Sequence, residues 1–136
     1  MILVDSSAWV EYDRATGSPV DVTLARLIGE GGAVAVTEPV VMEVCAGARS
    51  PGRERELRRP MDRFPLLTFD AAADLGAAVS IYRTCRRRGV TPRGLIDCLI
   101  AAVALRHDAE CLAWDRDLAR LSGVVGLRLH PDSLGP

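Results

Sequence analysis

The first five residues constrain the fold of this chain more than any other stretch. Residues 1–4 form a short run that is apolar on both faces, which is typical of a buried strand in a parallel sheet. Asp5 follows at once, and Ser6 and Ser7 come next, as suits the start of a helix. We therefore predict that Asp5 lies at the carboxyl edge of a sheet, where open α/β proteins usually bind ligands.

Short apolar segments alternate with helical segments along the whole chain. The alternation predicts an α/β fold with three layers, helices on both faces of a central, mainly parallel sheet of about five strands. No linker or repeat interrupts the 136 residues, so residues 1–136 are expected to form a single domain. The expected strands are 1–4, 33–36, 65–68, 110–114 and 127–129, and the longest helices are expected at 71–87 and 95–106.

The composition excludes several classes of protein. All 17 basic residues are arginines, so a P-loop lysine and a Schiff-base lysine are both absent. The four cysteines show no CxxC spacing and the two histidines stand apart, which argues against a zinc site. There is no signal peptide and no apolar run long enough to cross a bilayer, so we expect a cytoplasmic protein without a membrane partner.

Asp97 is the most informative single residue. It is the only charged side chain in the segment 95–105, which is otherwise apolar all round and therefore predicts a buried helix. A buried, unpaired carboxylate costs several kcal/mol, so Asp97 needs partners, a proton or a cation. The alternative is that backbone N–H groups of the first helical turn satisfy it.

Three further acids occupy comparable positions. Glu43 projects from a helical face of small and apolar residues, although it could instead pair with an arginine. Asp115 ends an apolar strand, although it could instead cap the next helix, and Asp117 follows two residues later.

The four acids Asp5, Glu43, Asp97 and Asp115 can all reach the same carboxyl edge of the predicted sheet. At a separation of ~5 Å and an effective dielectric of 20, each pair of carboxylates repels by about 3 kcal/mol. Such a cluster needs a compensating cation, and oxygen ligands favour Mg²⁺ or Mn²⁺. A site of this kind is suited to phosphoryl chemistry.

Four segments together resemble the PIN-domain ribonucleases, and in particular the VapC-type toxins of type II toxin–antitoxin systems. They are residues 3–9, 41–44, 94–102 and 115–118. The resemblance implies an endoribonuclease that depends on one or two Mg²⁺ or Mn²⁺ ions and hydrolyses phosphodiester bonds of structured RNA, tRNA or rRNA. It implies that an antitoxin inhibits the enzyme by occupying the active-site groove, and that the toxin forms a homodimer as well as a toxin–antitoxin hetero-oligomer. It also implies Asp5, Glu43, Asp97 and Asp115 as the catalytic and metal-binding acids, Asp117 as a further ligand, and Ser6 or Ser7 as support for the metal site.

Arginines are the candidate RNA contacts, because guanidinium groups bind phosphates bidentately and stack on bases. One group of arginines lies between residues 49 and 63, but acids interleave it, so a solvated, salt-bridged face is the alternative. The group that we favour has no interleaved acid and comes just before the helix of Asp97. Its members include Arg86, Arg87, Arg88 and Arg93.

Two other functions fit the same pattern of residues. One is a housekeeping PIN nuclease in RNA processing, and the other is a catalytically silent PIN-like binding module. A haloacid-dehalogenase-like phosphatase also places an acid after its first strand, but it needs an Asp-x-Asp motif and a lysine. Here Asp5 is followed by Ser6 and Ser7, and the chain has no lysine, so this third class is excluded.

Overall fold

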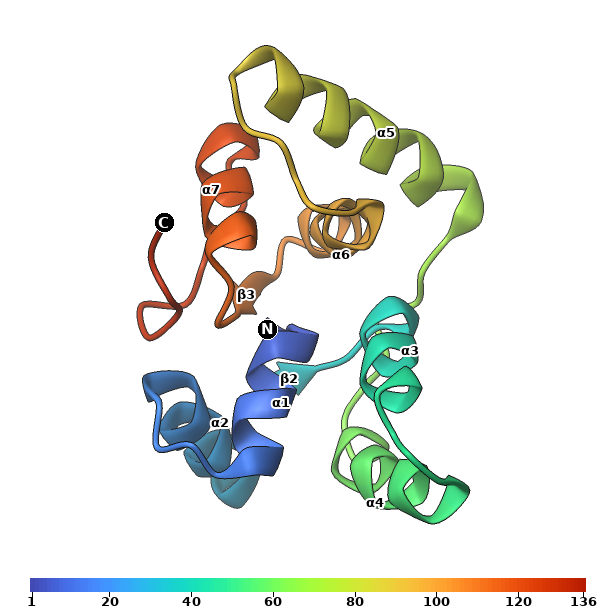
Figure 1. Cartoon of the computed structure of the whole chain (residues 1–136), viewed down its shortest axis with the longest axis vertical. Coiled ribbons are helices and arrows are strands. Elements are labelled where there is room, and N and C mark those ends of the chain that lie inside the picture. The colour runs from blue at the N-terminus through green and yellow to red at the C-terminus, as the bar shows by residue number, and fades with distance from the viewer.

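A parallel sheet of three short strands forms the centre of the computed structural model, which describes residues 1–136 (Figure 1). β1 (Ile2–Val4) pairs with β2 (Val34–Ala35) on one side and with β3 (Glu110–Leu112) on the other. Leu3 lies opposite Ala35 in one pairing and opposite Cys111 in the other. All three of these side chains are fully buried, because helices cover both faces of the sheet.

The prediction of about five strands is wrong, since the sheet has three. The two other expected segments do lie beside it, but each makes only one isolated parallel bridge, Leu66 with Val36 and Leu129 with Cys111. The first bridge cannot extend into a ladder on its N-terminal side, because Pro65 has no N–H to donate. An apolar run in the sequence does not distinguish a single bridge from a strand.

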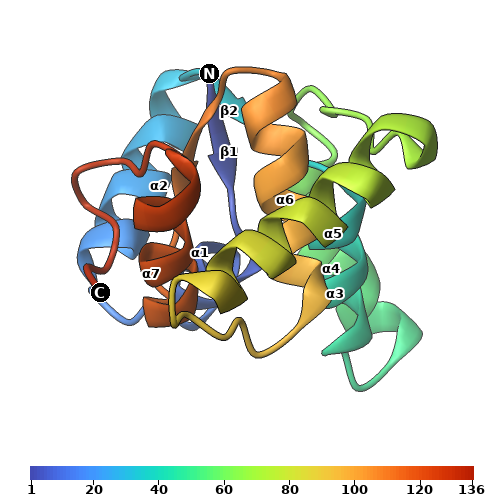
Figure 2. The same ribbon diagram turned by 90° about the horizontal axis from the view of Figure 1, so that it is seen from above.

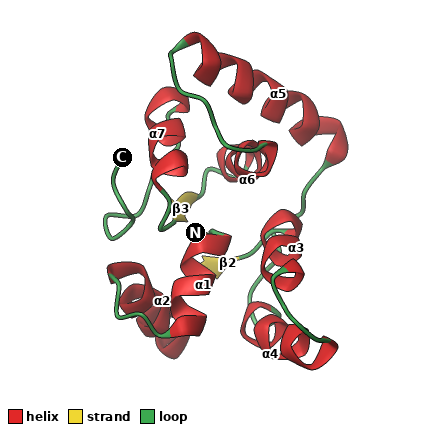
Figure 3. Ribbon diagram, viewed as in Figure 1, coloured by secondary structure: helices red, strands yellow, loops and turns green.

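Seven helices surround the sheet (Figure 3). In Figure 1 the first two lie on one side of the sheet, the last three lie on the other, and the middle two lie beyond the β2 edge. The expected helices at 71–87 and 95–106 are confirmed to the residue. The helices are α1 (Ser6–Arg14), α2 (Pro19–Glu30), α3 (Glu38–Ala46), α4 (Pro51–Met61), α5 (Ala71–Arg87), α6 (Leu95–Arg106) and α7 (Arg116–Val125).

α6 is the central helix, as its apolar sequence predicts. Ile100, Ala101 and Val103 are fully buried, and α5 packs across α6 (Figure 2). An ion pair with a buried carboxylate joins the two helices: Arg106 Nε donates to Asp74 Oδ1 at 2.9 Å, and its guanidinium also contacts Asp74 Oδ2. This packing fixes where the first turn of α6 stands relative to the sheet. No helix is both long and apolar enough to cross a membrane.

The strand order β2-β1-β3 places a crevice at one edge of the sheet. From β1 the chain moves to one side to form β2, and it then returns to the other side of β1 to form β3. At such a reversal the helices after neighbouring strands diverge, which leaves a crevice outside the carboxyl ends of the strands. Asp5 and Asp115 both lie just beyond those carboxyl ends.

Candidate functional site

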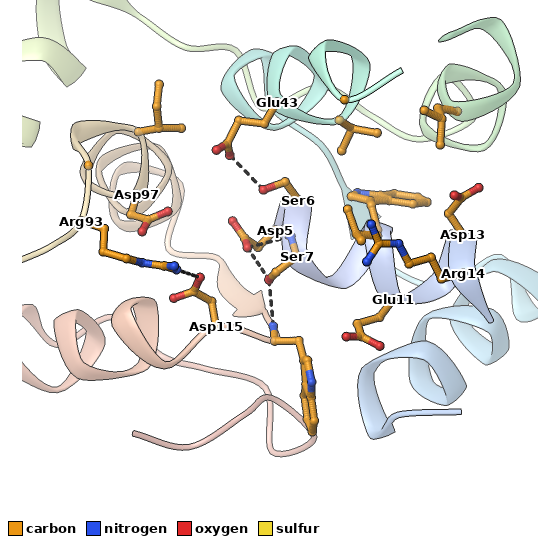
Figure 4. A pocket seen from close by; sticks show the side chains of 18 of the residues that line it. Asp5, Ser6, Ser7, Glu11, Asp13, Arg14, Glu43, Arg93, Asp97 and Asp115 are labelled. Carbon is orange, nitrogen blue, oxygen red and sulfur yellow. Dashed lines mark hydrogen bonds and ion pairs between the residues drawn. The ribbon is translucent and has the colours of Figure 1, made fainter. Parts of the chain in front are cut away.

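The structure brings the four predicted acids to one cavity of about 1090 Å³ at this crevice (Figure 4). Four different elements contribute them: the ends of the β1 and β3 segments, the middle of α3 and the first turn of α6. They are Asp5, Glu43, Asp97 and Asp115, and Ser6, Ser7 and Arg93 line the same cavity.

Asp5 caps a helix and also lines the cavity. Its Oδ2 accepts hydrogen bonds from the Ser7 backbone N–H at 3.0 Å and from the Ser7 hydroxyl at 2.5 Å, which caps α1. Its Oδ1 is buried and has no hydrogen-bond partner. Burial is the main reason that the pKa of Asp5 is raised, and the charge of Asp115 raises it further. The unpartnered oxygen needs a proton or a cation.

Ser6 and Ser7 both support the site, but they hold different acids. The Ser7 hydroxyl donates to Asp5 and accepts from the Trp114 backbone N–H at 2.9 Å, so it links the ends of the β1 and β3 segments. The Ser6 hydroxyl donates to Glu43 Oε1 at 2.9 Å. The sequence left open which serine supports the acids. In the structure both do, because each serine donates a hydrogen bond to a different carboxylate.

Replacing Ser7 with alanine is expected to lower the free energy of unfolding by about 1–3 kcal/mol, because the Trp114 N–H and Asp5 each lose a partner. Ser6→Ala is the matched control, since it removes one hydrogen bond to the half-buried Glu43 and should cost about 0.5–1 kcal/mol. Urea unfolding of both variants measures the difference. Equal losses would contradict the linking role of Ser7.

Asp97 has no hydrogen bond, so the alternative that backbone N–H groups of α6 satisfy it does not hold. Gly94 caps the helix and provides no side chain. Burial raises the pKa of Asp97 to about 7, and the charges of Asp5, Asp115 and Glu43 contribute in that order. The carboxyl group is therefore only partly ionised near pH 7, first because it is buried and then because the cavity already holds negative charge.

Glu43 does not pair with an arginine, which was the alternative to a place in the acidic cluster. It lies on the cavity side of α3, and its hydrogen-bond partner is Ser6. The pKa of Glu43 is raised, first by burial and then by the charges of Asp5 and Asp115. Glu43 therefore shares the electrostatic environment of the other three acids.

Asp115 uses its two oxygens for different purposes. Oδ1 caps α7 by accepting from the backbone N–H groups of Asp117 and Leu118 at 2.7 and 3.0 Å. Oδ2 faces the cavity and accepts from Arg93 at 2.6 Å. Arg93 also forms an ion pair with Asp117, so its guanidinium neutralises part of the negative charge at this edge. Asp115 can therefore cap α7 and belong to the acidic site at the same time, since a carboxylate has two acceptor oxygens.

The donor set fits a hard divalent cation. The cavity offers oxygen ligands alone, one of which is the buried, unpartnered Asp5 Oδ1, and neighbouring negative charges help to raise the pKa values of Asp5, Glu43 and Asp97. In this conformation no three acidic, histidine or cysteine side chains are arranged to chelate one ion. Ser6 holds Glu43 and Arg93 holds Asp115, so these two carboxylates have to turn before they bind the same cation as Asp5.

The structure places Arg93 at the site but leaves Arg86, Arg87 and Arg88 outside the cavity, at the end of α5. Arg86 contacts the Tyr82 hydroxyl and Arg87 contacts the Thr84 hydroxyl on their own helix. RNA binding by these three arginines stays a prediction.

Five cavity residues on α1, Trp9 and Arg14 among them, were not foreseen as site residues. A signal for Arg14 exists in the sequence. Ser6, Val10 and Arg14 are spaced four residues apart and so share one face of α1.

Comparison with known proteins identifies a family and a fold. Residues 2–124 match the PIN domain family. The chain is 44% identical over 129 residues to a VapC ribonuclease of Mycobacterium bovis and to ribonuclease VapC11 of Mycobacterium tuberculosis, covering 94% of this chain and 96% of each relative.

Solved structures share the fold at low sequence identity. VapBC2 from Rickettsia felis, bound to a promoter DNA fragment, superposes with a TM-score of 0.72 at 16% identity, covering 98% of this chain and 99% of that chain. Mycobacterium tuberculosis VapC20, a sarcin-ricin loop cleaving toxin, gives a TM-score of 0.64 at 18% identity, covering 94% and 99%.

Proposed function

The chain belongs to the PIN domain family, among the VapC-type proteins, and from this membership we propose that it is a metal-dependent endoribonuclease and the toxin of a toxin–antitoxin pair. The observation that carries the proposal is the cavity where Asp5, Glu43, Asp97 and Asp115 meet, one of them with a buried unpartnered oxygen. Burial and the neighbouring acids together raise the pKa of Asp97 to about 7, which scattered surface acids would not do.

Asp5, Asp97 and Asp115 would hold one or two Mg²⁺ or Mn²⁺ ions, with Asp117 as a further ligand. When bound, such an ion lowers the pKa of a water molecule and offsets the charge that builds up on phosphate oxygens. Ser7 keeps the Asp5 carboxylate oriented, and its hydrogen bond to the Trp114 N–H holds Asp115 close by. Ser6 similarly aims Glu43 into the cavity.

Glu43 is the candidate general base for the attacking water. Its raised pKa brings it nearer to neutral pH than that of an exposed glutamate, which suits proton transfer. Arg93 is the one arginine beside the four acids, and its side chain is 72% exposed. It would release Asp115 when a cation binds and would then be available for a phosphate oxygen.

We further propose that an antitoxin inhibits this enzyme by covering the cavity, and that the toxin forms homodimers within a toxin–antitoxin assembly. Several solved proteins of the same fold are toxin–antitoxin complexes. Leu75 and Val79, four residues apart on α5, are both about half exposed, and such an apolar stripe is suited to a protein partner. For the substrate we propose structured RNA, either tRNA or rRNA.

Incubation of the purified protein with total bacterial RNA tests the activity. We expect a small number of discrete cuts with Mg²⁺ or Mn²⁺ that leave 5′-phosphate ends, and none after chelation, because the acids cannot organise a water without a cation. Sequencing of the new 5′ ends identifies the substrate. Cleavage that persists in a chelator, or no cleavage of any RNA, would count against the proposal.

Expression in a bacterial host separates the proposed toxin from a housekeeping nuclease. A toxin should arrest growth, and co-expression of a small protein encoded by the neighbouring gene should relieve the arrest. A housekeeping enzyme would do neither. A silent binding module would show no cleavage in the first experiment and no stabilisation by Mn²⁺.

A further inference from the structure

The cavity extends well beyond the four acids. From Ser6 its wall follows α1 to Arg14, a distance of about 12 Å at 1.5 Å per residue. The opposite wall of this extension comes from the turn between α3 and α4, which contributes Arg49, and from the first turn of α4, which contributes Arg53. We call this extension the basic arm.

Charge is divided unequally between the two ends of the cavity. The acidic end holds Asp5, Glu43, Asp97 and Asp115 with one arginine, whereas the basic arm holds three arginines with two acids, Glu11 and Asp13. The arm is therefore the end of the cavity with excess positive charge. A phosphate backbone that reaches the acidic end would meet opposite charge on this side.

Two of the arginines in the arm are free to bind a ligand. Arg53 already forms ion pairs with Asp13 and Glu56. Arg14 and Arg49 form no ion pair and no side-chain hydrogen bond, and both are exposed. A guanidinium group offers five N–H donors, so both residues have their full capacity for phosphate oxygens.

Trp9 provides a second, independent observation. It lies in the cavity wall and is 3% exposed, yet its indole N–H has no hydrogen-bond acceptor. Buried polar groups in folded proteins are nearly always hydrogen-bonded, and each exception calls for an explanation. The unpartnered donor therefore marks this part of the cavity wall as one where the protein alone leaves hydrogen bonding incomplete.

We propose that the basic arm binds the sugar-phosphate backbone of RNA beside the cleaved bond, with Arg14 and Arg49 contacting successive phosphates. The inference rests on the proposed ribonuclease function and adds where the substrate lies. It also replaces the end of α5 as the principal RNA contact, because Arg86 and Arg87 point their guanidinium groups at their own helix and lie outside the cavity.

The test is RNA binding in the presence of a chelator, where cleavage does not occur. Fluorescence anisotropy with a labelled mixed-sequence RNA compares the intact protein with a double variant, Arg14→Gln with Arg49→Gln. We expect about tenfold weaker binding for each arginine removed. The slope of log affinity against log salt concentration should fall by about 1.4, at about 0.7 per phosphate contact on a single strand.

The matched control is Arg26→Gln with Arg128→Gln, two exposed arginines outside the cavity, which removes the same charge and should leave binding and slope nearly unchanged. A third variant, Arg14→Lys with Arg49→Lys, keeps both charges and should retain most of the slope. Thermal melting of every variant confirms that each is folded, as expected because Arg14 and Arg49 are exposed.

Two results would overturn the inference. Equal weakening by the two glutamine pairs would mean that RNA responds only to total charge. Unchanged RNA binding together with weaker antitoxin binding would mean that the arm is a protein contact. The proposed ribonuclease function can fail separately from this inference. If no RNA is cleaved but the variants change RNA binding as expected, the basic arm still binds RNA. If RNA is cleaved but the variants leave RNA binding unaltered, only the assignment of the basic arm is refuted.

Discussion

The Asp97→Asn protein is expected to show no detectable RNA cleavage at any Mg²⁺ or Mn²⁺ concentration. Asp97 opens the central helix and has no hydrogen-bond partner, so its carboxylate is available to a cation. Asparagine keeps the size of the side chain but removes the charge that binds the metal. The loss should exceed the roughly 10–100-fold that follows from removing a residue behind a metal ligand.

Asp108→Asn is the matched control for this variant. Asp108 carries the same charge, but its side chain is 95% exposed and lies away from the cavity. Its backbone has φ 51°, a conformation that asparagine accepts readily, so the control should fold and cleave like the original protein. Retention of metal-dependent cleavage by Asp97→Asn would remove Asp97 from the site.

Raising the pH from 5 to 8 is expected to lower the melting temperature of the metal-free protein by on the order of 10 °C. The pKa of Asp97 is raised to about 7 in the folded state, against 3.8 for the free side chain. Between those values the folded state binds more protons than the unfolded state, so stability falls as the pH rises. A difference of about three pKa units corresponds to on the order of 4 kcal/mol.

Other groups do not cancel this effect in the same pH range. The pKa values of Asp5 and Glu43 are also raised, so both act in the same direction. The pKa of Asp74 is lowered, chiefly by its hydrogen bonds to Arg106, and the stability that it contributes is lost only below about pH 4. We therefore expect maximal metal-free stability near pH 4.

Differential scanning calorimetry in a chelator at several pH values measures this profile. Asp97→Asn should flatten it and should melt higher than the original protein at pH 8, because one repulsive charge is gone. Added Mn²⁺ should stabilise the original protein most at pH 8, where the acids are ionised, and should have little effect on the variant. A profile that Asp97→Asn leaves unchanged would show that the acids are not electrostatically coupled.

The acids were predictable because each one interrupts a strong local pattern. Asp5 follows an apolar strand, and Asp97 lies alone in an apolar helix, so their positions in the fold follow from hydrophobic periodicity and helix boundaries. The alternative role of Asp115 as a helix cap proved partly correct, and Asp5 is a cap as well, since each of the two uses one oxygen to cap a helix. The sequence could not show that the second oxygen remains available.

Contacts between distant segments were the part that sequence patterns could not provide. The sheet is smaller than expected because Leu66 and Leu129 each form only one isolated bridge. Whether such a bridge extends into a strand depends on how the flanking loops approach the sheet. The partner of each serine, and the pairing of Arg93 with Asp115 and Asp117, likewise depend on tertiary structure. Arg14 lies on the cavity face of α1 by helical spacing, but only the fold shows that α4 begins opposite it.

The pairing of β1 with β3 has a consequence for how the protein is made. Ile2 pairs with Glu110, and the acids come from Asp5, Glu43, Asp97 and Asp115, so every one of these contacts joins segments that are far apart in the chain. Contacts of high sequence separation form late and slowly, because the intervening loop must first be closed. A chain still emerging from the ribosome therefore cannot assemble the acidic cluster before β3 has been synthesised. The proposed nuclease activity would therefore arise only in the completed fold.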